Sequence, residues 1–224
     1  MNLTTSSLDI EQARFNMIEQ QVRPWDVLDV RVLDVLRLVH RESFVRNRFV
    51  HQAFSDLMLP LEHDQVMMSP VVEGRMLQAL AVRSGEKVLE IGTGSGFIAA
   101  CLAQLGGQVT SVELFADLSD QARNTLEIQG YSDVVLETGD ASQGWNDRHT
   151  YDVIAITGAM DYLPESYKKK LNLGGRLFVV LGSEPNMVAT LFIRAAEDSW
   201  EEVSLFETSL PYLLGSEPVR RFSF

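Results

Sequence analysis

The stretch from Lys87 to Phe97, KVLEIGTGSGF, limits the fold of this chain more than any other segment. An apolar run with β-branched residues leads directly into glycines at positions 92, 94 and 96. Glycine loses more backbone freedom on folding than any other residue, so such a cluster needs a compensating gain. A tight turn, or the close approach of a ligand to the backbone, provides that gain. The stretch therefore predicts a buried strand followed by a ligand-binding turn.

From Lys87 onward, short apolar runs alternate with helical or polar segments. The runs are KVLEIG, QVTSVEL, DVVLETG, YDVIAITG and GRLFVVLG. This alternation is typical of a parallel sheet that helices cover on both faces. Two further runs, VATLFIRAAEDSW and WEEVSLFETSLPYLL, follow without a clear helix between them. We expect an α/β fold with a doubly wound, mostly parallel seven-stranded sheet that ends in a C-terminal β-hairpin.

The part of the chain before this sheet has a mainly helical pattern. Apolar residues recur at helical spacing between Ile10 and Val22, between Val32 and Val39, and again after Pro70. The first eight residues are largely polar, so we expect a frayed tail over residues 1–8. We expect a single domain over residues 9–224, in which a helical extension (9–84) packs on a ligand-binding core (85–224).

The acidic composition argues against two classes of partner. The 224 residues include 31 acidic and 19 basic side chains, which gives a formal net charge of −12. A broad surface for nucleic acid or anionic membrane needs the opposite sign. The single Cys101 forms no internal disulfide, and the sequence has neither the pattern of a signal peptide nor that of a membrane span. We therefore expect a cytoplasmic protein, with a monomer favoured.

The residues around the glycines narrow the choice of ligand. The dinucleotide fingerprint has a glycine or alanine in sixth place, where Phe97 or Ala99 stands, and the phosphate loop needs Gly-Lys-Ser or Gly-Lys-Thr, which is absent. Glu90 lies two residues before Gly92, and its carboxylate would repel a pyrophosphate. The same charge suits a ligand with an ammonium and a sulfonium group. These features favour S-adenosylmethionine (SAM) as the cofactor.

The pattern resembles the class I methyltransferases. In that family the glycine loop passes beneath the methionine and ribose of SAM, an acid at the end of the second strand binds the ribose hydroxyls, and an acid after the third strand lies near the adenine amine. SAM would leave as S-adenosylhomocysteine (SAH). The resemblance implies that the cofactor-binding residues are Glu90, Gly92, Thr93, Gly94, Gly96, Glu113, Leu114, Asp140 and Ala141.

Blocks outside the glycine loop narrow the resemblance further. RVLDVLRLVHRESFV, QVMMSPVVEGRM, TGDASQGW and LNLGGRLFVVLG resemble successive blocks of the protein-L-isoaspartate O-methyltransferases, from about Glu11 onward. The resemblance implies methylation of the α-carboxylate of isoaspartyl residues in damaged peptides and proteins. Such a carboxylate is ionised at neutral pH, so transfer needs alignment more than a general base. The four histidines lie without partners at ligand spacing, and we expect no metal site.

The chain departs from the family pattern at one position. The family has a hydroxyl residue on the wall of the acceptor pocket, two places before the proline, where this chain has Met68. The adjacent Ser69 is the candidate catalytic hydroxyl, although neighbouring side chains of an extended segment point to opposite faces. Ser69 can replace the missing group only if the loop shifts or bulges there. The alternative, which we favour, is that Ser69 only caps the helix that begins at Pro70.

Three functions stay open at this point. The first, which we expect, is an isoaspartyl methyltransferase. The second is a methyltransferase of the same fold whose acceptor is a small molecule or another protein carboxylate. The third is a SAM-binding module that recognises damaged or modified termini with little or no turnover. Cofactor turnover separates the third from the first two.

Overall fold

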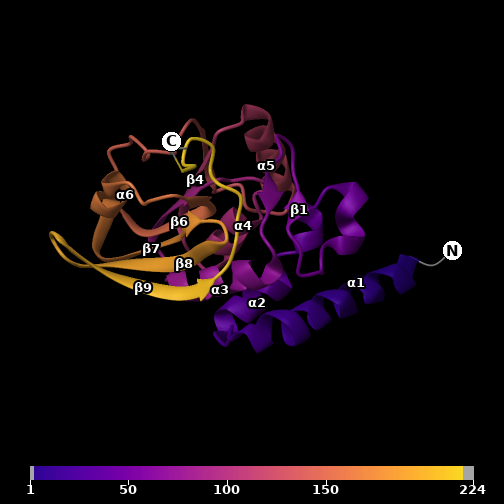
Figure 1. Ribbon diagram of the computed structural model, residues 1–224. Coiled ribbons are helices and arrows are strands. Elements are labelled where there is room, and N and C mark those ends of the chain that lie inside the picture. Colours follow the sequence, from indigo (N-terminus) through magenta and orange to yellow (C-terminus); the bar gives the residue numbers. More distant parts are fainter. Residues whose placement is uncertain (1–2, 219–224) are drawn as a thin grey trace, which may run out of the picture.

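The computed structural model describes residues 3–218. Residues 1–2 of the predicted tail and residues 219–224 of the predicted domain lie outside the described residues. The first helix, α1 (Leu3–Met17), begins inside the segment that we expected to be frayed. It projects to one side of the sheet, away from α6 (Glu165–Lys170), as Figure 1 shows.

The predicted helical extension consists of short helical pieces and one small hairpin. After α1 the chain forms a π-helical turn (Ile18–Val22) and a 3-10 turn (Arg23–Trp25). Helix α2 (Val30–Leu38) follows, and two more 3-10 turns come after it (Arg41–Phe44 and Asn47–Gln52). Farther along, β1 (Leu59–Pro60) and β2 (Val66–Met67) form a two-stranded antiparallel sheet. Helix α3 (Pro70–Leu80) then leads into the core.

The core alternates strands and helices as expected. Its elements are β3 (Lys87–Ile91), α4 (Phe97–Gln104), β4 (Gln108–Glu113), α5 (Ala116–Ile128), β5 (Val135–Thr138), β6 (Tyr151–Met160), α6, β7 (Leu171–Ser183), β8 (Asn186–Ala196) and β9 (Ser199–Glu207). The sheet has seven strands in the order β5-β4-β3-β6-β7-β8-β9. The pairs from β5 to β7 are parallel, and β8 and β9 add an antiparallel hairpin at the edge. The predicted fold class is confirmed.

The strand order fixes where a ligand can bind. The chain passes from β3 to β4 on one side and later returns to β6 on the other side of β3. In an open α/β sheet, the crevice at the carboxyl ends of the strands on either side of such a switch is the usual binding place. Glycines 92, 94 and 96 directly follow β3, so the glycine turn lies at this crevice.

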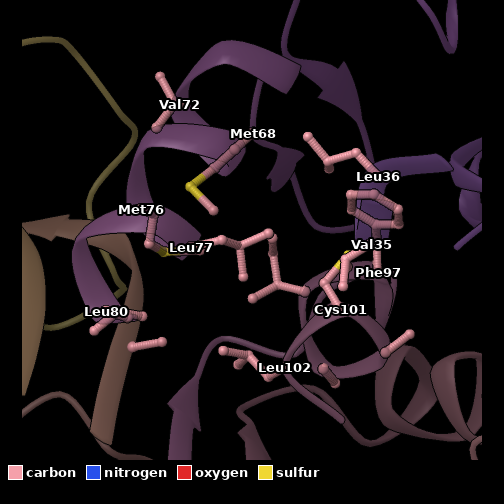
Figure 2. Close-up of a cluster of buried hydrophobic side chains, with 14 of the residues drawn as sticks. Val35, Leu36, Met68, Val72, Met76, Leu77, Leu80, Phe97, Cys101 and Leu102 are labelled. Atoms are coloured by element: carbon pink, nitrogen blue, oxygen red, sulfur yellow. The ribbon is translucent and has the colours of Figure 1, made fainter. Parts of the chain in front are cut away.

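The two faces of the sheet have separate apolar cores. Val88 belongs to the cluster formed with α2, α3 and α4, whereas the next residue, Leu89, belongs to the cluster under α6. Figure 2 shows side chains of α2, α3 and α4 meeting in the first cluster, with Met68 among them. Burial of these side chains removes apolar surface from water, which is the main stabilising term in folding. The extension thus shares one core with the sheet.

Within residues 3–218, no helix combines the length and the apolar character needed to cross a membrane.

Candidate functional site

An open cleft lies at the carboxyl ends of β3, β4 and β6. It encloses about 710 Å³ of space outside the protein atoms, and its walls come from the loop between β1 and β2, the glycine turn, the residues after β4 and β5, and the segment after β9. Of the predicted cofactor-binding residues, six line this cleft: Gly92, Gly94, Glu113, Leu114, Asp140 and Ala141.

Glu113 ties the end of β4 to the glycine turn. Its side chain is buried, and one carboxylate oxygen accepts a hydrogen bond from the backbone N–H of Gly94 at 2.8 Å. The other oxygen accepts from the N–H of Phe115 at 3.2 Å. Gly94 has a φ of +52°, a left-handed conformation that favours glycine, and this conformation presents its N–H to Glu113. The carboxylate is therefore held in one orientation at the edge of the cleft.

Asp140, which follows β5, lines the same cleft and is more exposed than Glu113. Its Oδ1 accepts a hydrogen bond from the N–H of Ser142 at 2.8 Å, which orders the turn after β5. Leu114 and Ala141 add apolar surface beside the two acids. A polar ligand with an apolar ring system fits such a lining.

Gly96 does not line the cleft. It has a φ of +85°, and a Cβ there would lie 3.3 Å from the Cβ of Ala122 on α5. Gly96 also occupies the N-cap position of α4. The third glycine therefore allows α4 and α5 to pack closely, which differs from the ligand contact that the resemblance implied.

A smaller inner pocket lies beside the cleft, between the glycine turn and the segment that joins β2 to α3. It encloses about 290 Å³ and shares Leu61, Val66, Gly92, Gly94 and Thr157 with the cleft. Glu90 and Thr93, which we expected to bind cofactor, line this inner pocket rather than the open cleft. Glu73 lines it as well.

Glu90 is fully buried at the inner pocket. Its Oε2 accepts a hydrogen bond from the hydroxyl of Ser111, which also contacts the hydroxyl of Thr93. Among the described residues, Oε1 of Glu90 has no hydrogen-bond partner. The pKa of Glu90 is raised to about 8: burial is the largest cause, the hydrogen bond from Ser111 opposes it, and the charge of Glu113 adds to it. A cation in the inner pocket would favour the ionised form of this carboxyl group.

Ser69 lies at the start of α3, in its N-cap position, but does not cap this helix with its side chain. Asp56 does so instead, because its Oδ1 accepts from the N–H of Val71 at 3.2 Å. Ser69 lines neither the cleft nor the inner pocket. Met68 reaches the wall of the inner pocket, but it is only 4% exposed and packs in the core (Figure 2).

Sequence reasoning missed several residues of the cleft. Thr157 lines both the cleft and the inner pocket, and its hydroxyl lies 2.9 Å from the carbonyl oxygen of Ile91 and 2.7 Å from that of Gly92. The segment from Pro211 to Leu214 forms another wall. Two hydrogen bonds to β6 anchor this segment. The N–H of Ala159 donates to the carbonyl of Pro211, and the N–H of Leu213 donates to the carbonyl of Ala159, each at 2.9 Å. Thr157 and Ala159 both belong to the last four residues of β6, TGAM.

The loop between β1 and β2 closes one side of the cleft. Leu61 in this loop lines both the cleft and the inner pocket. The ring of His63 stacks on that of Phe115, with centroids 3.9 Å apart, and Nε2 of His63 lies 2.9 Å from each carboxylate oxygen of Asp117. The hydrogen bond with His63 lowers the pKa of Asp117. The extension is therefore fastened to the start of α5, beside Glu113.

The chemistry of the lining suits a small cationic ligand. Two buried carboxyl groups, those of Glu90 and Glu113, lie beside a turn whose backbone is free of large side chains. The lining residues described for the cleft and the inner pocket include no histidine or cysteine. Within residues 3–218, no group of three His, Cys, Asp or Glu side chains is arranged to hold a metal ion. The residues that line the cleft and the inner pocket can therefore bind such a ligand and hold it in a fixed orientation.

Comparison with known proteins identifies relatives along nearly the whole chain. Residues 13–209 match the family described as protein-L-isoaspartate(D-aspartate) O-methyltransferase. A protein-L-isoaspartate O-methyltransferase 1 of Rhodopseudomonas palustris is 36% identical over 91% of this chain and 84% of its own length. A protein-L-isoaspartate O-methyltransferase of Brucella anthropi is 33% identical over 93% of this chain and 96% of its own length.

Solved structures agree on the fold. A protein-L-isoaspartate O-methyltransferase structure superposes with a TM-score of 0.78 at 23% identity, over 91% of this chain and 66% of that chain. A Plasmodium falciparum structure of a putative protein-L-isoaspartate O-methyltransferase in complex with SAH has the same TM-score at 16% identity, over 88% of this chain and 96% of that chain. Given the family match and the relatives above 30% identity, this chain belongs to the protein-L-isoaspartate O-methyltransferase family.

Proposed function

We propose that this protein is a SAM-dependent O-methyltransferase that methylates the α-carboxylate of L-isoaspartyl residues in damaged proteins. The main support is the junction of the glycine turn with two buried carboxyl groups, Glu90 and Glu113, in a chain of this family. The relatives act, by their names, on L-isoaspartate in proteins.

The residues present fit the cofactor. We assign the ribose to Glu113, whose carboxylate is held by two backbone N–H groups and can still accept from hydroxyls. We assign the adenine side to Leu114, Asp140 and Ala141. We assign the charged methionyl end to the inner pocket beside Gly92, Thr93 and Gly94, where the buried Oε1 of Glu90 has no partner within residues 3–218. Gly96 supports this arrangement through the packing of α4 on α5.

The chemistry needs little help from side chains. When bound, SAM supplies an electrophilic methyl group on its sulfonium. The acceptor α-carboxylate is ionised at neutral pH, so the chain needs to hold one of its oxygens in line and to exclude water. That oxygen gains the methyl group as a methyl ester, and SAH is released. Thr157, Met67 and Met68 line the inner pocket together with the glycine turn, whereas Ser69 takes part only if its segment moves.

A peptide pair tests this proposal directly. The protein is incubated with saturating SAM and either an isoaspartyl peptide or its aspartyl counterpart, and both SAH and base-labile methyl ester are measured. We expect ester and SAH in equal amounts with the isoaspartyl peptide and only background with the aspartyl control. SAM turnover without preference for the isoaspartyl peptide would contradict the proposed acceptor.

A Gly94→Val variant serves as the matched control. A Cβ at this position would lie 3.1 Å from the Cδ1 of Leu61, and the left-handed backbone disfavours a β-branched residue. We expect the variant to keep its circular dichroism spectrum and to lose SAM binding. A folded variant that binds SAM within about twofold of the parent would contradict the cofactor placement.

A second candidate is a methyltransferase of the same fold with a different carboxylate acceptor. The packing of Met68 in the core favours it, because the position that holds a hydroxyl in the family presents none here. A panel of carboxylate acceptors, compared by kcat/KM, separates the two functions. Action as a monomer in the cytoplasm, without nucleic acid, stays a prediction that sedimentation and fractionation can test.

A further inference from the structure

Arg41 and Glu73 form an ion pair that is completely enclosed by protein. The two side chains are 0% and 1% exposed. Nε of Arg41 donates to one carboxylate oxygen of Glu73 at 2.9 Å, and an NH2 hydrogen donates to the other at 3.1 Å. This two-pronged geometry matches the planar guanidinium to the carboxylate and fixes the relative position of the two groups.

The same guanidinium also binds backbone. One terminal nitrogen donates to the carbonyl of Ala53 at 3.0 Å, and the other donates to the carbonyl of Met68 at 2.5 Å. The guanidinium carbon lies 5.5 Å from the centre of the Phe97 ring, at the start of α4. Arg41 therefore joins the extension, the segment between β2 and α3, and the helix that follows the glycine turn.

The contact with Met68 places this clamp at the acceptor side of the site. Met67 and Met68 line the inner pocket, and Glu73 lines it from the first turn of α3. Displacement of the Met68 carbonyl would therefore move this wall relative to Gly92 and Gly94. A charged pair at this depth is a poor source of stability, because its desolvation offsets most of its attraction. Its geometry, however, has a direct effect on the wall.

We propose that Arg41, paired with Glu73, is a positioning residue for methyl transfer. It acts through the Met68 carbonyl and holds Met67–Ser69 where the acceptor carboxylate has to align with the methyl donor. This inference rests on the proposed function. Alignment errors of about 1 Å can cost a hundredfold in rate, so a small shift of the wall is enough to matter.

Helix α3 provides a matched control at its opposite end. Arg176 makes a two-pronged pair with Glu86, with both distances 2.8 Å, and also donates to the carbonyls of Leu80 and Ala81. Neither member lines the cleft or the inner pocket. The number and kind of hydrogen bonds match those of Arg41, so the two clamps differ chiefly in location and burial.

The test compares two double variants, Arg41→Met/Glu73→Leu and Arg176→Met/Glu86→Leu. Replacing both partners removes the two enclosed charges together. The carbonyls of Ala53 and Met68 still lose their donor, so we expect a urea midpoint below that of the parent but above that of Arg41→Met. For the first variant we expect kcat/KM for the isoaspartyl peptide to fall at least about tenfold, with SAM affinity within about twofold of the parent. For the second we expect both quantities to stay within about twofold.

Full activity in a folded Arg41→Met/Glu73→Leu variant would overturn the proposal, since a merely structural pair is replaced without kinetic cost. If that variant does not fold, Arg41→Lys decides the matter. Lysine keeps the charge but lacks the fork needed for Glu73 and two carbonyls together. We expect faster hydrogen exchange at Met67, Met68 and Ser69 and a lower kcat/KM; unchanged exchange and kinetics would contradict the proposal.

The parent enzyme separates failure of this inference from failure of the proposed function. If the parent does not prefer the isoaspartyl peptide, the proposed acceptor is wrong. The clamp is then judged by hydrogen exchange alone: local loosening at Met67–Ser69 in Arg41→Lys supports it, and parental protection there overturns it.

Discussion

The two ends of α3 are held by nearly the same hydrogen bonds in different surroundings. At the N-terminal end, Arg41 and Glu73 are 0% and 1% exposed, and at the C-terminal end Arg176 and Glu86 are 13% and 16% exposed. The pKa values move in opposite directions. Burial, the largest influence, raises the pKa of Glu73, whereas the hydrogen bond from Arg176 lowers that of Glu86. The effect of burial on the pKa therefore exceeds that of the neighbouring arginine for Glu73 but not for Glu86.

This difference separates two uses of the same interaction. The partly exposed clamp keeps its carboxylate ionised and joins the end of α3 to β7 at low cost. The enclosed clamp places a guanidinium and a carboxyl group next to a pocket, where burial disfavours the ionised form of the carboxyl group. Removing the cation should therefore have unequal consequences.

The largest expected effect is on stability after loss of one arginine. Arg41→Met leaves Glu73 and the carbonyls of Ala53 and Met68 enclosed without their donor, which should cost roughly 3–5 kcal/mol of unfolding free energy. Arg176→Met leaves groups that water can reach, and about 1–2 kcal/mol is expected. Urea unfolding of the two single variants measures this contrast. Equal losses would mean that the difference in exposure has no energetic weight.

The second effect is on the pH dependence of stability. Glu90 has a folded pKa of about 8 against an ordinary value of 4.5, so the folded protein binds the extra proton between these values. Its contribution is complete below about 4.5 and is lost as pH rises through 8. Glu86, with a lowered pKa, contributes above 4.5 and loses its contribution as pH falls through the folded value.

Variants of the two acids check these signs. The free energy of unfolding is measured in urea between roughly pH 4 and pH 9. It should decline less steeply at alkaline pH in Glu90→Gln, and less steeply at acid pH in Glu86→Gln, than in the parent. Glu73, Glu113, Arg41 and Cys101 lie in the same charged neighbourhood as Glu90 and remain unchanged in this comparison. An identical alkaline limb in Glu90→Gln and the parent would show that Glu90 is ionised throughout.

The third effect repeats the comparison within the cleft. Glu113 is buried and holds two backbone N–H groups, whereas Asp140 is exposed and holds one. Glu113→Ala should weaken SAM binding by roughly 1.5–3 kcal/mol, or at least about tenfold, and Asp140→Ala should weaken it less. Calorimetric titration with SAM tests the order. A larger loss for Asp140→Ala would reverse the proposed ribose and adenine assignments.

The smallest expected effect concerns Ser69. Its hydroxyl makes no capping bond, so Ser69→Ala should change unfolding free energy by less than about 0.5 kcal/mol. Asp56→Ala should cost about 1 kcal/mol, because the N–H of Val71 loses its acceptor. Thermal unfolding of both variants measures the difference. Loss of turnover in Ser69→Ala at unchanged stability would instead identify Ser69 as the working hydroxyl.

The sequence predicted the parts of the fold that depend on neighbouring residues. The apolar run before Gly92 predicted a buried strand, and the alternation of apolar and helical segments after it predicted the sheet, because both patterns are formed by consecutive residues. The contacts that sequence reasoning missed join distant residues: Glu73 is 32 residues from Arg41, and Asp56 is 15 residues from Val71. Ser69 matched every local rule for a helix cap. The carboxylate of Asp56 accepts the capping hydrogen bond instead. A pattern of a few consecutive residues cannot predict which of two acceptors far apart in the sequence makes this bond.

The wall formed by Pro211–Leu214 comes after β9, the last strand of the sheet. During synthesis, the residues of all seven strands are therefore made before this wall exists. The cleft is among the last parts of the described chain to be completed, although the glycine turn is made much earlier. A nascent chain can thus assemble its sheet while its binding site still lacks one side.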